Sequence, residues 1–179
     1  SLGDIKTMAG AKHTIELTQV DDVKVFANFR GGWLNPVEGE PLPADERRVR
    51  LTPFGMADLP KESPIRVEWL NNPPNFGSWN AGQAVSWDLR LTQGGAYAAS
   101  AMYATANEGA AFELTLDGKP VLAKPSPSTG DWQKYDTVDL GVVQIPAGAH
   151  RLTLTWNVDR KTDAGNLRDL RLDKAPAGH

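Results

Sequence analysis

Six tryptophans are the residues of this 179-residue chain with the clearest potential for chemistry. Trp79, in FGSWNAG, and Trp132, in STGDWQKY, lie among glycine, asparagine, serine and aspartate, a composition typical of loops. An indole offers a flat apolar face with negative π density, which can stack on the C–H face of a sugar ring. The two loop tryptophans are therefore candidates for a pair that holds one sugar between them.

A sugar held in this way also needs hydrogen-bond partners for its hydroxyl groups. Asn80, Asp131 and Asn166 carry amide and carboxylate groups that could supply them. The alternative is that both rings only fill one end of the fold. Trp87, in AVSWDL, and Trp156, in LTLTWNV, fall within alternating runs instead, and we expect them in the core.

The elements that position these residues are expected to be strands. Apolar and polar residues alternate with a period of two along the chain, and about ten such runs are separated by turn-forming segments. No stretch shows apolar residues at helical spacing. Asp117 and Gly118 predict a hairpin turn between FELTL and VLAKP, because Asp-Gly suits a tight turn with positive φ. Many short strands favour a β-sandwich or a β-barrel.

We expect one domain preceded by an extension. Residues 35–45, rich in proline and acidic residues, form a candidate linker or long crossover. The sequence is therefore divided into an N-terminal extension or linker with one or two strands at residues 1–48, a sandwich at 49–175 and a disordered tail at 176–179. The extension has too few strands for a core of its own, so it should pack on the sandwich or belong to a missing neighbour.

Composition excludes several classes of partner. The formal charge of −3 and the pI near 5.6 give no basic field for nucleic acid. No run of about 18 apolar residues is present, so we expect no membrane partner. The chain has no cysteine, which removes disulfides and thiolate metal sites. The first residues lack the features of a signal peptide, which favours a fragment or a mature piece.

Catalytic chemistry has little support in the sequence. Glycoside hydrolysis usually needs two carboxyl groups about 5 to 10 Å apart, one of them poised as an acid. Carboxylates at strand ends and in loops are more often simply solvated. No Gly-X-Ser-X-Gly, His-Glu-X-X-His or phosphate-loop motif occurs. We assign no catalytic residue and expect that the chain is not an enzyme.

Three stretches carry a family resemblance: FGSWNAGQAVSWDLRLTQGGAYAASAMYATANEGAAFELTLDG, STGDWQKYDTVDLGVVQIPAGAHRLTL and GNLRDLRL. In this order and spacing, residues 51–172 resemble the family six and family thirty-five carbohydrate-binding modules, including those appended to bacterial fucosidases, sulfatases and related polysaccharide-processing enzymes. The resemblance implies an all-β jelly-roll β-sandwich of two antiparallel sheets, with a sugar site in the loops at one end. Trp79 and Trp132 match the two aromatic residues that sandwich the sugar, and Asn166 matches the asparagine that hydrogen-bonds it.

The resemblance also implies a structural calcium ion, held in part by a glutamate of the first strand. The corresponding stretch here, RLTPFGMADL, has no glutamate. Asp173 could contribute one oxygen, but calcium takes about six to eight oxygen ligands and the sequence does not assemble them. Structural calcium therefore stays open, and no other cofactor is expected.

The expected function is that of a non-catalytic carbohydrate-binding module that targets an attached glycoside hydrolase, sulfatase or similar enzyme to glycan. The expected partners are an oligo- or polysaccharide, whose sugar the sequence leaves open, and the catalytic domain of the parent enzyme. Such a bacterial protein would be secreted, and so extracellular or periplasmic. The alternative is a structural or docking β-sandwich that packs on a catalytic domain without a ligand of its own. Exposed rings of Trp79 and Trp132 facing each other would favour binding, whereas buried rings would favour the docking sandwich.

Overall fold

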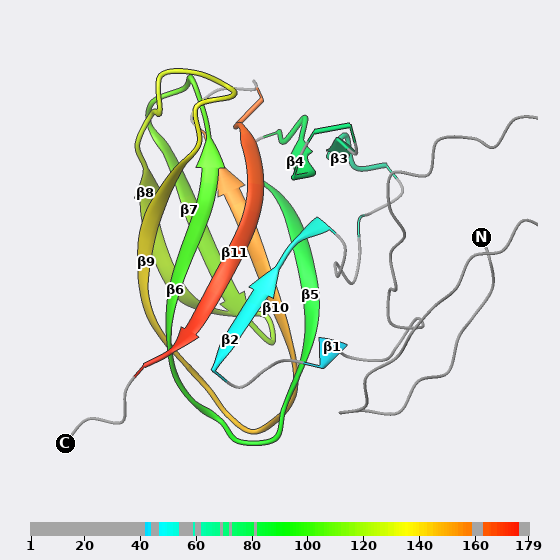
Figure 1. Ribbon diagram of the computed structural model, residues 1–179, viewed down its shortest axis with the longest axis vertical. Helices are drawn as coiled ribbons and strands as arrows, with labels where there is room; N and C mark the ends of the chain where they lie inside the picture. Colours follow the sequence, from blue (N-terminus) through cyan, green and yellow to red (C-terminus); the bar gives the residue numbers. More distant parts are fainter. Residues whose placement is uncertain are drawn as a thin grey trace, which may run out of the picture.

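The structure, a computed structural model, describes residues 42–43, 47–53, 59, 62–68, 70–71, 73–80, 82–158 and 163–175. These residues form eleven strands in two sheets, with no α-helix among them (Figure 1). The strands are β1 (Leu42–Pro43), β2 (Arg48–Leu51), β3 (Arg66–Glu68), β4 (Asn75–Gly77), β5 (Gln83–Leu91), β6 (Gly95–Ala104), β7 (Ala110–Leu116), β8 (Lys119–Ser126), β9 (Asp136–Ile145), β10 (Gly148–Asn157) and β11 (Asn166–Lys174). The prediction of an all-β sandwich is confirmed.

The two sheets have a jelly-roll arrangement in which neighbouring strands are mostly far apart in sequence. One sheet has the order β1-β5-β10-β7-β8, and the other has the order β3-β4-β11-β6-β9 with β2 also paired to β11. The pairs are antiparallel except for the short β1, which runs parallel to β5. The first two described strands are thus divided between the sheets, with β1 in one and β2 in the other.

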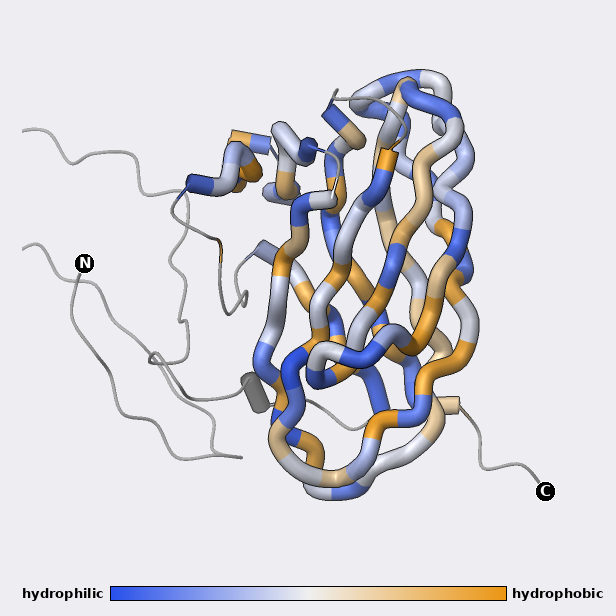
Figure 2. The backbone as a smooth tube through the Cα atoms, turned by 180° about the vertical axis from the view of Figure 1, so that it is seen from behind, coloured by the Kyte–Doolittle hydropathy of each residue, from blue (hydrophilic) through white to orange (hydrophobic). Residues whose placement is uncertain are grey.

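Alternation along the strands builds the core between the sheets. In β7, Phe112, Leu114 and Leu116 are buried while the residues between them are half-buried. The same alternation is visible along the long strands in the hydropathy of the backbone (Figure 2). Trp87 and Trp156 are fully buried, as expected, because successive side chains of a strand point to opposite faces and theirs point inward. Burial of such large rings contributes strongly to the stability of the core.

The hairpin between β7 and β8 is confirmed. Asp117 and Gly118 both have positive φ, 51° and 76°, as a tight two-residue turn requires. The carboxylate of Asp117 also accepts a hydrogen bond from the backbone N–H of Arg151 at 2.8 Å and contacts Nδ1 of His150 at 2.8 Å. The turn is therefore tied to the neighbouring strand β10.

An irregularity in β11 shapes the end of the sandwich near the candidate site. The pairing of β11 with β6 shifts register between Leu167 and Asp169, so Arg168 is an extra residue without a paired partner on β6. Such a bulge changes which face the residues on either side point to. Leu167 before it, and Leu170 and Leu172 after it, are all fully buried.

Among the described residues, sheet pairing starts at Leu42, ahead of the sandwich boundary expected at residue 49. The strand-like runs HTIELTQV and DVKVFANF of the expected extension lie outside the described residues, as does the tail at 176–179. The division into extension, sandwich and tail therefore stays a prediction. Within the described ranges, no helix is long and apolar enough to cross a membrane.

Candidate functional site

Several predicted site residues lie at the end of the sandwich where β4 and β6 end and β9 and β11 begin (Figure 1). Trp132 lies in the loop between β8 and β9, and Asn166 is the first residue of β11. The side-chain amide of Asn166 donates a hydrogen bond to the backbone carbonyl of Trp132 at 2.8 Å. The structure thus brings these two predicted residues together.

Trp132 is an exposed ring on an anchored loop. Its accessible fraction is 37%. Thr129, three residues earlier, is buried, and its hydroxyl accepts a hydrogen bond from the backbone N–H of Thr105 at 2.9 Å. The carboxylate of Asp131 accepts one from the backbone N–H of Gln133 at 2.7 Å. These contacts hold the backbone on both sides of Trp132, so the ring is presented from a loop of defined conformation.

Two acceptor oxygens, one from Glu68 and one from Asn166, lie close together at Gly77. A Cβ atom added at Gly77 would lie 2.6 Å from Oε1 of Glu68 and 3.0 Å from Oδ1 of Asn166, so both oxygens lie against this glycine. The other oxygen of Glu68 accepts hydrogen bonds from the side-chain amides of Asn71 and Asn75, at 2.8 and 2.9 Å. Oε1 of Glu68 and Oδ1 of Asn166 have no hydrogen-bond donor among the described residues. This pair can accept hydrogen bonds from hydroxyl groups of a ligand.

A cation–π pair lies next to these acceptors. The guanidinium carbon of Arg168 lies 3.5 Å from the ring centroid of Tyr135. The hydroxyl of Tyr135 and Nε of Arg168 are buried without a hydrogen-bond partner in the described structure. Burial raises the pKa of the Tyr135 hydroxyl, with the nearby Glu68 adding to the rise and Arg168 and Asn166 opposing it. The phenol therefore stays protonated and can act as a donor at neutral pH.

The prediction that Trp79 stands open in a loop is wrong. Its side chain is fully buried, and its ring makes edge contacts with Phe76 and Trp156 at centroid distances of 6.0 and 5.9 Å. Its indole N–H donates to the carbonyl of Gln83 at 2.8 Å, so the polar edge is satisfied inside the fold. Trp79 plugs the end of the sandwich, and a sugar held between Trp79 and Trp132 is excluded in this conformation.

Asp163 ties the loop of Trp79 to the start of β11. Its Oδ1 accepts hydrogen bonds from the backbone N–H groups of Trp79 and Gly165, at 2.9 and 3.2 Å. Burial raises the pKa of this carboxyl, the backbone hydrogen bonds oppose the rise, and the nearby Glu68 adds to it. Two carboxylates thus lie near the same end of the sandwich, one free to accept from a ligand and one used to fix loops.

The remaining predicted ligand residues are exposed. Asn80 follows Trp79, and its backbone N–H donates to the side chain of Gln83 at 3.1 Å. Asp131 lies directly before Trp132 and is exposed. Roles for Asn80 and Asp131 in holding a ligand stay predictions.

Glu68, Tyr135 and Arg168 were not found from the sequence. Glu68 lies in the run IRVEWL, where alternation alone does not tell which face meets a site. Tyr135 is three residues after Trp132, and Arg168 is two after Asn166, so proximity to the predicted residues was the available signal. The bulge at Arg168 could not be read from the sequence pattern.

Comparisons with known proteins agree with the β-sandwich fold. The sequence model for carbohydrate-binding module family 6 matches residues 64–174, and the chain belongs to this family. No curated protein matches the sequence.

Solved structures of both resembling families share the fold. The C-terminal family 6 module of LamC, a laminarinase from Zobellia galactanivorans, is 21% identical, with a TM-score of 0.59 over 71% of this chain and 99% of that one. A family 6 module from Clostridium cellulolyticum in complex with xylose is 22% identical, with a TM-score of 0.57 over 70% and 97%. A family 35 module from Clostridium thermocellum is 18% identical, with a TM-score of 0.56 over 72% and 98%.

Proposed function

We propose that this protein is a non-catalytic module that binds a sugar at the loop end of the sandwich, with Trp132 stacking on one face of the ring. A hydroxyl group both donates and accepts, so a sugar edge needs protein acceptors and donors together. Oε1 of Glu68 and Oδ1 of Asn166 supply acceptors, and the Tyr135 hydroxyl and the Arg168 guanidinium lie nearby as donors.

The observation that carries the proposal is the contact of Asn166 with Trp132. One side chain fixes the backbone of an exposed aromatic residue through its amide nitrogen and leaves its oxygen beside that of Glu68. The stacking surface and the polar groups are thereby held together. With Trp79 in the core, the ligand is held by one stacked ring rather than two, which favours weak binding that depends strongly on Trp132.

The module is proposed to be part of a larger secreted enzyme and to bring that enzyme to glycan. The module from Zobellia galactanivorans is the C-terminal part of a laminarinase, which is the precedent for this arrangement. Laminari-oligosaccharides and xylo-oligosaccharides are the first probes to use, because the neighbours include a laminarinase module and a module in complex with xylose.

A glycan array followed by isothermal titration with the oligosaccharides that score highest tests the proposal. The wild-type protein should bind at least one neutral glycan, and Trp132→Ala should not. Val142→Ala is the matched control, because Val142 is another exposed apolar residue, on β9, and its loss should leave binding unchanged. Binding by wild type and Trp132→Ala alike would refute the site, and no binding to any glycan would leave a docking β-sandwich as the better description.

A further inference from the structure

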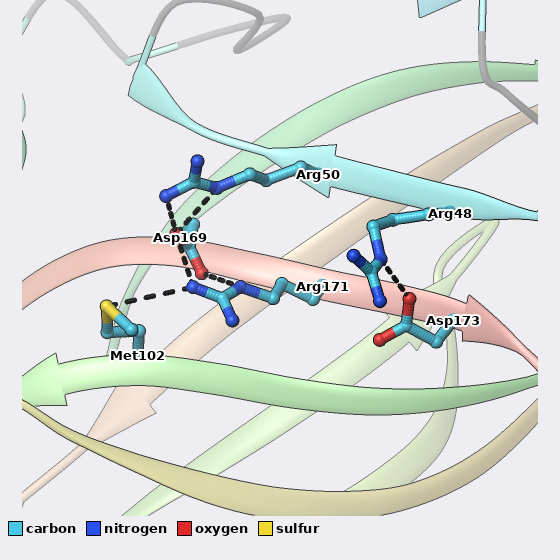
Figure 3. Close-up of polar contacts among 6 residues, drawn as sticks. All are labelled: Arg48, Arg50, Met102, Asp169, Arg171 and Asp173. Atoms are coloured by element: carbon cyan, nitrogen blue, oxygen red, sulfur yellow. Dashed lines mark hydrogen bonds and ion pairs between the residues drawn. The ribbon is translucent and has the colours of Figure 1, made fainter.

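Five charged side chains on the outer face of the sheet join β2 to β11 (Figure 3). Asp169, Arg171 and Asp173 alternate along β11 with the buried Leu170 and Leu172, so they point away from the core. The neighbouring strand contributes two arginines, Arg48 and Arg50. Every one of these five side chains is engaged in an ion pair within the group.

Asp169 is the centre of the group. Arg50 and Arg171 lie directly opposite each other in the pairing of β2 with β11, a placement in which like charges repel. The Asp169 carboxylate separates them: Oδ2 accepts from Nε and Nη2 of Arg50, at 2.8 and 2.5 Å, and Oδ1 accepts from Nε of Arg171 at 2.9 Å. The carboxylate is fully buried under the two guanidinium groups.

The second pair differs in burial. Nε of Arg48 donates to Oδ1 of Asp173 at 2.5 Å. The exposed fractions of the two side chains are 70% and 42%. An ion pair so open to water contributes little to stability. Arg48 therefore provides a matched comparison for Arg50 on the same strand.

These residues do not fit the structural calcium ion that the family resemblance implies. Calcium takes about six to eight oxygen ligands, most of them from carboxylates and carbonyls. Both oxygens of Asp169 already accept from arginine, and Asp173 is paired with Arg48. Within the described ranges, no group of three or more histidine, aspartate or glutamate side chains could hold a metal ion. Three arginines outnumber two aspartates here, so a divalent cation would also meet a positive charge.

We propose that the guanidinium group of Arg50 takes over the structural role of a bound cation at Asp169. It neutralises a buried carboxylate and fixes β2 onto β11, so the sandwich keeps its stability without divalent metal. This proposal does not depend on the sugar site, which lies at the bulged start of β11, whereas the ion pairs follow the bulge.

The experiment measures the thermal unfolding midpoint of the 179-residue chain in calcium chloride and in EDTA. The wild-type midpoint should differ by less than about 1 °C between calcium chloride and EDTA. If a metal ion bound the folded state but not the unfolded chain, the midpoint would rise with the concentration of the metal. A wild-type midpoint that rises by several degrees with calcium overturns the proposal.

Arg50→Met and Arg48→Met then test the guanidinium directly, since methionine keeps much of the apolar stem of arginine. Arg50→Met should lower the midpoint by about 5 °C or more, because it leaves the buried Asp169 with Arg171 alone. Arg48→Met should lower it by less than about 2 °C. Equal midpoints for the two variants overturn the proposal.

Arg50→Lys covers the case in which Arg50→Met does not fold. Lysine keeps the charge but cannot donate through the planar fork that Arg50 uses on Oδ2. A midpoint clearly below that of the wild type supports the proposal, and a wild-type midpoint overturns it.

Discussion

The side-chain amide of Asn166 lies 2.8 Å from the backbone carbonyl of Trp132, which joins the first residue of β11 to the loop before β9. One hydrogen bond therefore connects the exposed ring to the sheet. The oxygen of the same amide lies next to Gly77 and Glu68.

Trp132→Ala should abolish measurable glycan binding while changing the free energy of unfolding by less than about 0.5 to 1 kcal/mol, because the ring is partly exposed. Titration calorimetry measures the binding, and urea unfolding measures the stability. A large loss of stability would show that the ring packs into the fold rather than serving a ligand.

Asn166→Asp should weaken binding at least tenfold, since a carboxylate cannot donate to the carbonyl of Trp132. The new carboxylate and the carbonyl of Trp132 are both acceptors, so placing them together without a donor should also cost about 1 to 3 kcal/mol of stability. Asn80→Asp is the control for stability, because Asn80 is exposed and should change it by less than about 0.5 kcal/mol. Equal losses in the two variants would contradict the importance of the hydrogen bond.

Trp79→Ala should lower the free energy of unfolding by about 3 to 5 kcal/mol, because it leaves a cavity beside Phe76 and Trp156. Trp79→Phe should cost less, since it retains most of the ring volume while losing the N–H bond to Gln83. Urea unfolding measures both. Full stability of Trp79→Ala together with lost glycan binding would restore the two-ring clamp.

Gly77→Ala should weaken the affinity for glycan while having a smaller effect on the free energy of unfolding. The new methyl group would lie 2.6 Å from Oε1 of Glu68 and 3.0 Å from Oδ1 of Asn166, so the flexible end of Glu68 must move away from Gly77. The acceptor pair is thereby displaced while the backbone of β4 stays in place. Binding is measured by titration with the best oligosaccharide, and unchanged affinity would show that Glu68 takes no part in it.

Asp163 gives a prediction for pH. Burial raises the pKa of its carboxyl, so the folded state holds the proton more tightly than the unfolded chain does. The contribution of this group to stability is therefore fully present below about pH 4, the ordinary pKa of an aspartate, and declines as pH rises through the raised value. Asp163→Asn keeps an acceptor oxygen without the charge.

The free energy of unfolding of Asp163→Asn, relative to that of the wild type, should thus increase as pH rises from about 3 to about 7. Urea unfolding at a series of pH values measures this difference. A difference that shrinks over the same range would mean that the hydrogen bonds from Trp79 and Gly165 outweigh burial.

Alternation predicted the strands and limited the fold to a sandwich or a barrel, because side chains of a strand with one buried face alternate every two residues. The family resemblance selected the sandwich. Alternation also placed Trp87 and Trp156 in the core correctly. The same reasoning failed for Trp79, whose glycine- and asparagine-rich surroundings indicated an exposed loop. A loop can still turn one large ring inward, and here that ring closes the end of the core.

The polar half of the site was harder to predict, because it depends on contacts between distant segments. Glu68 meets Asn166 only through the pairing of β4 with β3 on one side and β11 on the other. Asn166 itself was found because the resemblance placed it at the start of the last strand. Sequence pattern gives such neighbours only when the register of the sheet is known.

The extra residue in β11 separates two tasks within one strand. Asn166, before Arg168, serves the loop end, whereas Asp169 and the residues after it bind β2. Leu167 and Leu170 are both buried although they are three residues apart, and the extra residue is what lets both point inward while Asn166 serves the loop end. One extra residue thus keeps the interior continuous along the whole strand while its outer face changes from the amide of Asn166 to the carboxylate of Asp169.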